Sequence, residues 1–296
     1  MAAVFFGSTF PVTKEALGGA GPYAVTAIRF LAGGLVLLPW ARRRPRADGE
    51  VRATFWCSLA LLSGYLLLTV GLQSTTSTAA AFITYLLVVI VPVVSALMTR
   101  RLPSRAVTAG VALATFGLLL LVGRFRLGLG EWLTLGCAFA FAGHILFLGA
   151  FAARVDVVRL TAFQLVAVGL GSTIPALALG EMRGLSGGAL LACGYLAAVG
   201  VGGLLLQIAG QRVVGPTRAS LLLMLEPILA ALGGYAIGER ITTLGFVGAG
   251  LILAGILVSE LDPPFWQRDP AVDGGIPLPK PCGGPETLDP AVKRDR

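Results

Sequence analysis

Two apolar runs joined by a short charged link fill residues 213–257, and this segment constrains the fold more than any other part of the sequence. The first run extends from about residue 216 to 236, and the second from about 243 to 258. Each approaches the roughly 20 apolar residues that a helix needs to cross the hydrocarbon core of a bilayer. The link between them reads Gly-Glu-Arg and suits a turn in water. The segment therefore predicts two antiparallel helices that cross a membrane.

An earlier segment, residues 74–122, follows the same plan. It has a polar, Thr-containing start, a run of small residues, a proline inside the first apolar run, an Arg-bearing link and a closing run rich in Gly, Ala and Leu. Placing Pro92 on Pro227 aligns the two segments at an offset of 135 residues. Self-similarity on the scale of half a chain is typical of transporters built from two fused repeats. The sequence therefore predicts an internal duplication.

The composition excludes a soluble globular domain. Hydrophobic residues make up 56% of the chain and charged residues 13%, whereas a soluble domain carries about 25% charged residues. The net charge of +8 comes mainly from arginines in the links between apolar runs. Such a distribution orients a protein in a membrane, and it does not require a nucleic-acid partner. We therefore expect a lipid bilayer as the surroundings and no nucleic acid as a partner.

The apolar runs predict ten membrane spans with short connections. Their approximate bounds are residues 2–18, 22–41, 54–72, 77–98, 106–122, 130–150, 159–179, 188–207, 216–236 and 243–260. Residues 262–296 are rich in Pro, Gly and charge and have little to bury, so we expect a disordered tail there. The predicted fold class is an all-α integral membrane protein of about ten transmembrane helices. Residues 1–125 would form a first five-helix repeat and residues 126–261 a second, inverted one.

The Lys and Arg residues of the connections predict the orientation, because cytoplasmic loops carry an excess of them. With the N-terminus inside, twelve of these residues lie in inner connections and five in outer ones. The inner ones are Arg42, Arg43, Arg44, Arg46, Arg52, Arg100, Arg101, Arg105, Arg154, Arg159, Arg212 and Arg218, and the outer ones are Lys14, Arg124, Arg126, Arg183 and Arg240. Both termini are therefore expected in the cytoplasm. Five spans per repeat is an odd number, so the second repeat enters the membrane inverted, as in transporters that work by alternating access.

Several motifs carry a resemblance to a known family. They are P-T-R-A-x(5)-L-E-P at residues 216–227, G-E-R-x-T at 238–242, G-A-x-L-I-L-A-G at 248–255, F-G-S-T-F-x-x-x-K at 6–14, A-I-R-F at 27–30, and the segment 75–95. Over about residues 1–260 the chain resembles the EamA-like transporters of the drug/metabolite transporter superfamily. The resemblance implies that spans one to four and six to nine enclose a central pathway, with spans five and ten outside it.

The resemblance also implies a function. The chain would be a secondary transporter of the cytoplasmic (inner) membrane that exports small metabolites, such as amino acids or related amphipathic compounds, by alternating access. Either the substrate gradient or a bound proton would drive it, and no cofactor is expected. The glycine-rich run at residues 200–203 lacks the lysine of a phosphate-binding loop, so we expect no ATP site. A homodimer is compatible with the sequence.

Two other classes of function stay open on the residues alone. A lipid or lipid-headgroup flippase would share the repeats, and the basic inner connections are compatible with it. A membrane-embedded enzyme would need paired acids, a metal cluster, or a nucleophile with a base, whereas the spans hold an isolated glutamate and an isolated histidine. The four cysteines include no Cys-x-x-Cys pair, so no metal site is expected. We therefore expect no enzymatic activity.

Glu226 is the first candidate for a functional residue. It lies about halfway along the ninth span, where a carboxylate needs a partner, water or a proton. Pro227 follows it, and Pro92 lies in the fourth span; each lacks a backbone N–H and predicts a break in its helix. Glu226 could bind a substrate amine or a proton, or it could be a structural carboxylate paired with a freed backbone group or an arginine. The sequence leaves both interpretations open.

Three further candidates carry or can carry positive charge. His144, the only histidine of the chain, could bind or relay a proton, or it could be hydrogen bonded between helices. Arg29 in the second span could attract an anionic group or extend its side chain to the interface. Lys14 lies at the outer end of the first span, where an interfacial position is expected, and the family motif has a lysine there.

Polar uncharged residues complete the candidates. Tyr85 and Gln164 fall well inside spans, and Gln73 lies at a span end. Hydroxyl and amide groups can line a polar pathway without charge neutralisation. Taken singly, each such group could equally join two helices by a hydrogen bond.

Overall fold

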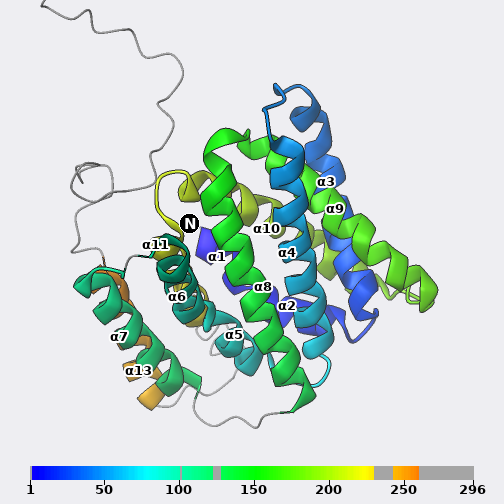
Figure 1. Cartoon of the computed structure of the whole chain (residues 1–296). Helices are drawn as coiled ribbons and strands as arrows, with labels where there is room; N and C mark the ends of the chain where they lie inside the picture. Colours follow the sequence, from blue (N-terminus) through cyan, green and yellow to red (C-terminus); the bar gives the residue numbers. More distant parts are fainter. Residues whose placement is uncertain (1, 101, 123–127, 230–242, 260–296) are drawn as a thin grey trace, which may run out of the picture. The chain divides into compact units, whose positions relative to one another are not determined.

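The computed structural model describes residues 2–100, 102–122, 128–229 and 243–259, and within these ranges the regular structure is entirely helical (Figure 1). The helices are α1 (Ala2–Gly7), α2 (Thr9–Ala16), α3 (Pro22–Arg42), α4 (Glu50–Gly71), α5 (Ser77–Tyr85), α6 (Leu87–Thr99), α7 (Arg105–Val122), α8 (Leu129–Phe151), α9 (Val157–Ala178), α10 (Gly187–Gln211), α11 (Pro216–Leu223) and α13 (Thr243–Ser259). Residues 225–229 are also helical, and a 3₁₀ turn follows α8. The predicted link at residues 238–240 and the predicted tail at 262–296 lie outside the described residues.

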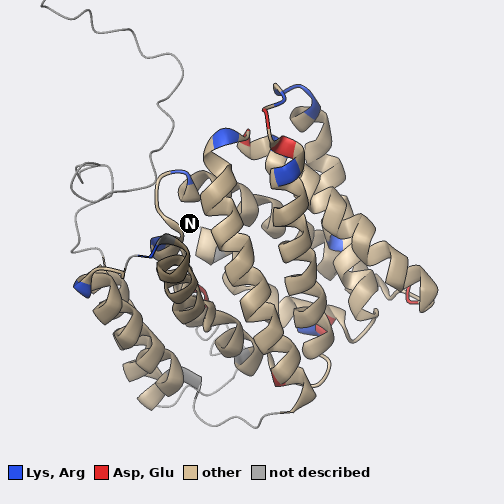
Figure 2. Cartoon of the chain, in the orientation of Figure 1, with Lys and Arg blue, Asp and Glu red and all other residues tan. Residues whose placement is uncertain are grey.

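The helices have the length and composition of membrane spans. In the described part of the chain, six are long and apolar enough to cross a bilayer, and two shorter apolar helices accompany them. Lys, Arg, Asp and Glu gather at the ends of the helices and leave their middles almost free of charge (Figure 2). The described part of the chain is thus all-helical, and the protein is a multi-pass membrane protein, as the sequence predicted.

Three of the predicted spans are interrupted. The first span divides at Ser8 into α1 and α2, which differs from the single helix expected over residues 2–18. Pro11 explains this break, because it lacks the N–H that would bond to the carbonyl group of Gly7 one turn earlier. The fourth span divides at Leu86, before Pro92. The ninth divides at Met224, shortly before Pro227.

The helices pack in pairs that come from opposite halves of the chain. Helix α3 packs along α9, α7 along α13, and α4 along α8, while α1 and α2 lie against α10 and α11 lies against α6. Small residues along the facing sides of α7 and α13 let the two helices approach closely, as is common between membrane helices. A Cβ atom added at Gly110 would lie 2.5 Å from the carbonyl oxygen of Gly255, and one added at Gly117 would lie 2.5 Å from that of Gly248. These contacts hold the pair together through backbone atoms.

A buried ion pair joins three helices at one end of the bundle. Arg159, near the start of α9, lies 2.6 Å from the carboxylate of Glu50 at the start of α4. Its Nη1 also donates to the carbonyl oxygens of Ala41 and Arg44, at 3.2 and 3.1 Å. These carbonyl groups belong to the C-terminal end of α3, where a cation is favourable. One side chain therefore fixes α3, α4 and α9 relative to one another.

Candidate functional site

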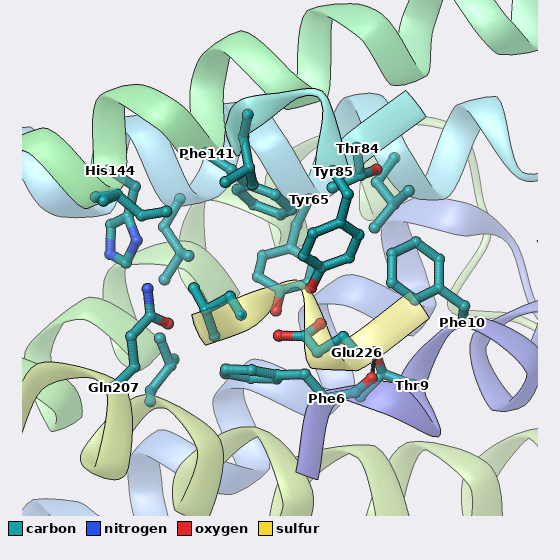
Figure 3. Close-up of a pocket in the computed structure, with 16 residues that line it drawn as sticks. Phe6, Thr9, Phe10, Tyr65, Thr84, Tyr85, Phe141, His144, Gln207 and Glu226 are labelled. Atoms are coloured by element: carbon teal, nitrogen blue, oxygen red, sulfur yellow. Dashed lines mark hydrogen bonds between the residues drawn. The ribbon is translucent and has the colours of Figure 1, made fainter. Parts of the chain in front are cut away.

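A cavity of about 60 Å³ lies beside the breaks in the fourth and ninth spans (Figure 3). The described residues that line it are Phe6, Thr9, Phe10, Leu61, Tyr65, Leu68, Thr84, Tyr85, Leu87, Phe141, His144, Ile145, Leu204, Gln207, Leu223 and Glu226. They come from spans one, three, four, six, eight and nine. The resemblance led us to expect spans two and seven at the pathway as well. Among the described residues, these two spans contribute none to this cavity, because α3 and α9 pack against each other instead.

Glu226 supplies the cavity's acidic group. Its side chain is 4% exposed, and it follows the break at Met224 by two residues. Figure 3 shows the hydroxyl groups of Tyr65 and Tyr85 pointing toward its carboxylate, and that of Tyr85 lies within hydrogen-bonding reach. The two phenols come from α4 and α5, so the carboxylate is held by helices of the other half of the chain. One hydroxyl donor only partly replaces the water that a carboxylate loses on burial.

Aromatic rings form much of the rest of the wall. Phe6 and Phe10 lie on either side of the break at Ser8, and Phe141 comes from α8. Phe141 packs on the ring of Tyr65, with their centroids 5.0 Å apart. The π-face of an aromatic ring carries partial negative charge and attracts cations. Rings and carboxylate together give the cavity the electrostatics of a cation site.

Arg29 lies behind this wall and does not line the cavity. Its guanidinium carbon is 4.9 Å from the ring centroids of both Phe30 and Tyr65, and its Nη1 donates to the hydroxyl of Thr13 at 3.2 Å. The side chain is 3% exposed, and its Nη2 has no hydrogen-bond partner. Tyr65 thus separates the buried cation from the carboxylate of Glu226.

His144 and two glutamines form a second polar group. Gln164 donates from Nε2 to the carbonyl oxygen of Leu160 at 3.2 Å, so its Oε1 is free to accept. His144 Nε2 lies 2.8 Å from this Oε1 and therefore donates to it. His144 and Gln207 line the cavity, whereas Gln164 stands behind His144. The hydrogen bond orients the imidazole from a helix outside the cavity.

The remaining two candidates lie away from the cavity. Lys14 donates from Nζ to the carbonyl oxygens of Leu72 and, at 2.8 Å, of Thr75. It therefore caps the C-terminal end of α4, where the helix dipole favours a cation. Gln73 is exposed and does not line the cavity.

The phenylalanines Phe6, Phe10 and Phe141 are residues of the site that the sequence did not indicate. Phe6, Phe10 and Phe141 lie in apolar runs in which aromatic residues are common. One local signal was available: Phe6 and Phe10 are four residues apart, with Ser8 between them and Pro11 following. That pattern could have indicated a broken helix with both rings on one side.

The comparisons with known proteins decide the family. The sequence profile of the EamA-like transporter family matches residues 1–123 and again residues 128–261. The chain belongs to the EamA-like transporter family. This family is part of the drug/metabolite transporter superfamily, and its profile matches each half of the chain once, in keeping with the predicted duplication.

Relatives of this EamA-like chain support the assignment. Two proteins of Archaeoglobus fulgidus, each described as an uncharacterized transporter, are 30% and 27% identical to it. Each match covers 88% of this chain, together with 84% and 93% of the relative. A solved crystal structure that is 20% identical superimposes with a TM-score of 0.72 over 88% of this chain and 95% of its own. That likeness shows a shared fold.

Proposed function

We propose that this EamA-like chain is a secondary transporter that binds a small amine-bearing metabolite at Glu226 and exports it by alternating access. Its substrate would be an amino acid or a related amphipathic compound. The observation that carries the proposal is a single buried carboxylate in a cavity whose other described lining residues are aromatic, apolar or uncharged polar. An ammonium group offers such a carboxylate the opposite charge and donors for hydrogen bonds.

The arrangement of the helices supports alternating access. In two repeats of five spans, each span of the first half has its equivalent five spans later. Helices α3 and α9, the second and seventh spans, are therefore equivalent and pack on each other. The same holds for α7 and α13, the fifth and tenth spans. The first span (α1 and α2) packs on the eighth (α10). The equivalent contact, between the sixth span (α8) and the third (α4), is also present. Such pairing is what a pseudo-two-fold axis between two inverted repeats requires. Inverted repeats give two related packings around one central site.

The breaks in the helices support a binding site at the same place. Discontinuous spans near the middle of the membrane commonly form the sites of secondary transporters. Here the break at Leu86 precedes Pro92 and the break at Met224 precedes Pro227. Tyr85 and Glu226 lie directly beside these breaks and face each other (Figure 3). A carboxylate that holds either a proton or a substrate amine would also offer a simple means of coupling.

The proposed orientation places both termini in the cytoplasm of a cell with the protein in its inner membrane. The twelve-to-five distribution of Lys and Arg motivates it. Cys57, Cys137 and Cys193 are buried, so an impermeant thiol reagent should label intact cells little at these positions. We expect Cys282 to react with this reagent only after the membrane is opened, with Cys282→Ser as the control. Labelling of Cys282 in intact cells would contradict the orientation.

Flux through proteoliposomes tests the proposed function. The purified chain, without ATP, should exchange labelled amine-bearing metabolites across the bilayer in a saturable manner, with unlabelled compound on the other side. Carboxylates that lack an amine, such as acetate, should show no protein-dependent exchange. Exchange of carboxylates in preference to amines would overturn the proposal. Scrambling of a labelled lipid without exchange of any soluble amine would favour the flippase instead.

A further inference from the structure

We propose that the substrate is an amphipathic amine whose ammonium group lies beside Glu226 and whose apolar chain extends into a second cavity between α1, α10 and α11. This inference rests on the proposed function and narrows its substrate class. It favours alkyl and arylalkyl amines over zwitterionic amino acids, since it assigns the two ends of the substrate to two compartments of different chemistry.

The second cavity is an open groove with an apolar lining: Leu206 and Leu222 in its wall are 39% and 36% exposed, and Gly210 is exposed. It measures about 290 Å³ and is lined by residues such as Ala2 of α1, Leu206 and Gly210 of α10, and Ala219 and Leu222 of α11. The described residues around it include no charged side chain; two glutamine amides are its polar groups. An apolar cavity of about 150 Å³ is large enough to bind benzene. The second cavity therefore offers room for a chain of several carbon atoms.

The two cavities share part of their walls. Leu223 and Gln207 line both of them, and Glu226 follows Leu223 by three residues in the same span. The Gln207 amide is loosely held, since its hydrogen bond to Gln211 Oε1 is 3.5 Å long. The two compartments therefore adjoin each other at Gln207 and Leu223. A molecule with its head beside Glu226 would then direct its chain past Gln207.

Charge and volume both limit what the first cavity can take. At about 60 Å³ it has room for an ammonium head group but little more. Glu226 is the only charged residue among the described residues that line either cavity. The carboxylate of an amino acid or the phosphate of a lipid would therefore lie close to a like charge, which is unfavourable. Arg29 does not offset this repulsion, because it does not line the cavity and packs against the ring of Tyr65, which does.

The test measures how binding depends on chain length. The probes are n-alkylammonium chlorides from ethyl to hexyl, and calorimetry follows their binding to the purified full-length chain. We expect affinity to rise about fourfold with each methylene that enters the second cavity. Hexanoate, which has an alkyl chain of similar length and the opposite charge, should not bind and thereby controls for partition into lipid or detergent.

Gly210→Leu tests whether the alkyl chain of the ligand occupies the second cavity. A Cβ atom at Gly210 meets no atom within 4 Å, so leucine can enter the cavity without disturbing the helix. The variant should lose roughly 50-fold in affinity for hexylammonium, the equivalent of about three methylenes, and keep its affinity for ethylammonium. Gly194→Leu is the matched control, because Gly194 lies on the same helix with open space at its Cβ and lines neither cavity. Ala219→Leu fills the second cavity from α11 and should reproduce the effect.

The outcomes separate this inference from the proposed function. Suppose that ethylammonium binding disappears in Glu226→Gln, whereas Gly210→Leu and wild type bind hexylammonium equally well. This result would overturn the proposal that the alkyl chain occupies the second cavity, and it would keep the amine site at Glu226. Failure of every amine to bind wild type would overturn both. A stepwise gain with chain length that Gly210→Leu abolishes and Gly194→Leu keeps is the result expected here.

Discussion

Replacing Glu226 with glutamine is expected to lower the exchange of amine substrates by about 100-fold or more. Removing one partner of a buried charge pair costs about 3–5 kcal/mol, and every 1.4 kcal/mol corresponds to a factor of ten. Glutamine keeps the shape of the side chain, so the loss would come from the charge alone. Proteoliposome exchange at substrate concentrations below saturation measures it. Tyr85→Phe, which removes a hydroxyl group that points to the carboxylate, should cost about tenfold.

The stability of the same variant distinguishes a binding carboxylate from a structural one. Glutamine is neutral and has nearly the shape of a protonated glutamic acid, so unliganded Glu226→Gln should unfold at about the same temperature as wild type or higher. Glu15→Gln, a change at an exposed carboxylate of α2, should leave both stability and exchange unchanged. A variant that exchanges substrate normally but unfolds at a clearly lower temperature would make Glu226 a structural residue.

Removing the carboxylate of Glu50 is expected to produce the largest loss of stability, about 3–5 kcal/mol. Glu50 and Arg159 have side chains that are 5% and 12% exposed. Glu50→Ala would leave the guanidinium part-buried, with only the carbonyl oxygens of Ala41 and Arg44 to accept its hydrogen bonds. Helices α3, α4 and α9 would lose their common attachment. Thermal unfolding of the purified protein, with Glu15→Ala as the control, measures the effect.

The double variant Glu50→Leu/Arg159→Met provides the second half of this test. An apolar pair of similar volume often replaces a buried ion pair at little cost. We therefore expect it to recover much of the stability that Glu50→Ala loses. Recovery should be incomplete, because the hydrogen bonds to the end of α3 are lost too. If Glu50→Ala unfolds at the wild-type temperature, the ion pair does not hold the three helices together.

The fold could be predicted from the sequence because the bilayer leaves few choices. A long apolar run must be helical when no water is present to bond its backbone, so the spans follow from hydropathy alone. Glu226 could be found the same way, since one carboxylate in an apolar run is conspicuous. The break at Ser8 was not predicted, although Pro11 lies at the middle of the span predicted over residues 2–18, where a proline removes a backbone hydrogen bond.

The aromatic wall of the cavity could not be predicted by such reasoning. Phe139 and Phe141 are two residues apart on α8, yet Phe139 is 58% exposed, whereas Phe141 lines the cavity. Hydropathy treats them alike, and only the packing of α8 on α4 separates them. The packing of α3 on α9 likewise removes Arg29 and Gln164 from the cavity. Which face of an apolar helix meets the cavity is decided by its neighbours.

Thermal unfolding with an added amine tests the central claim most directly. A ligand at 100 times its dissociation constant stabilises the folded state by about 2.7 kcal/mol, which raises the unfolding temperature measurably. Hexylammonium should raise the unfolding temperature of the wild-type chain and leave the unfolding temperature of Glu226→Gln unchanged. Equal stabilisation of both proteins, or stabilisation by hexanoate alone, would contradict a substrate site built around Glu226.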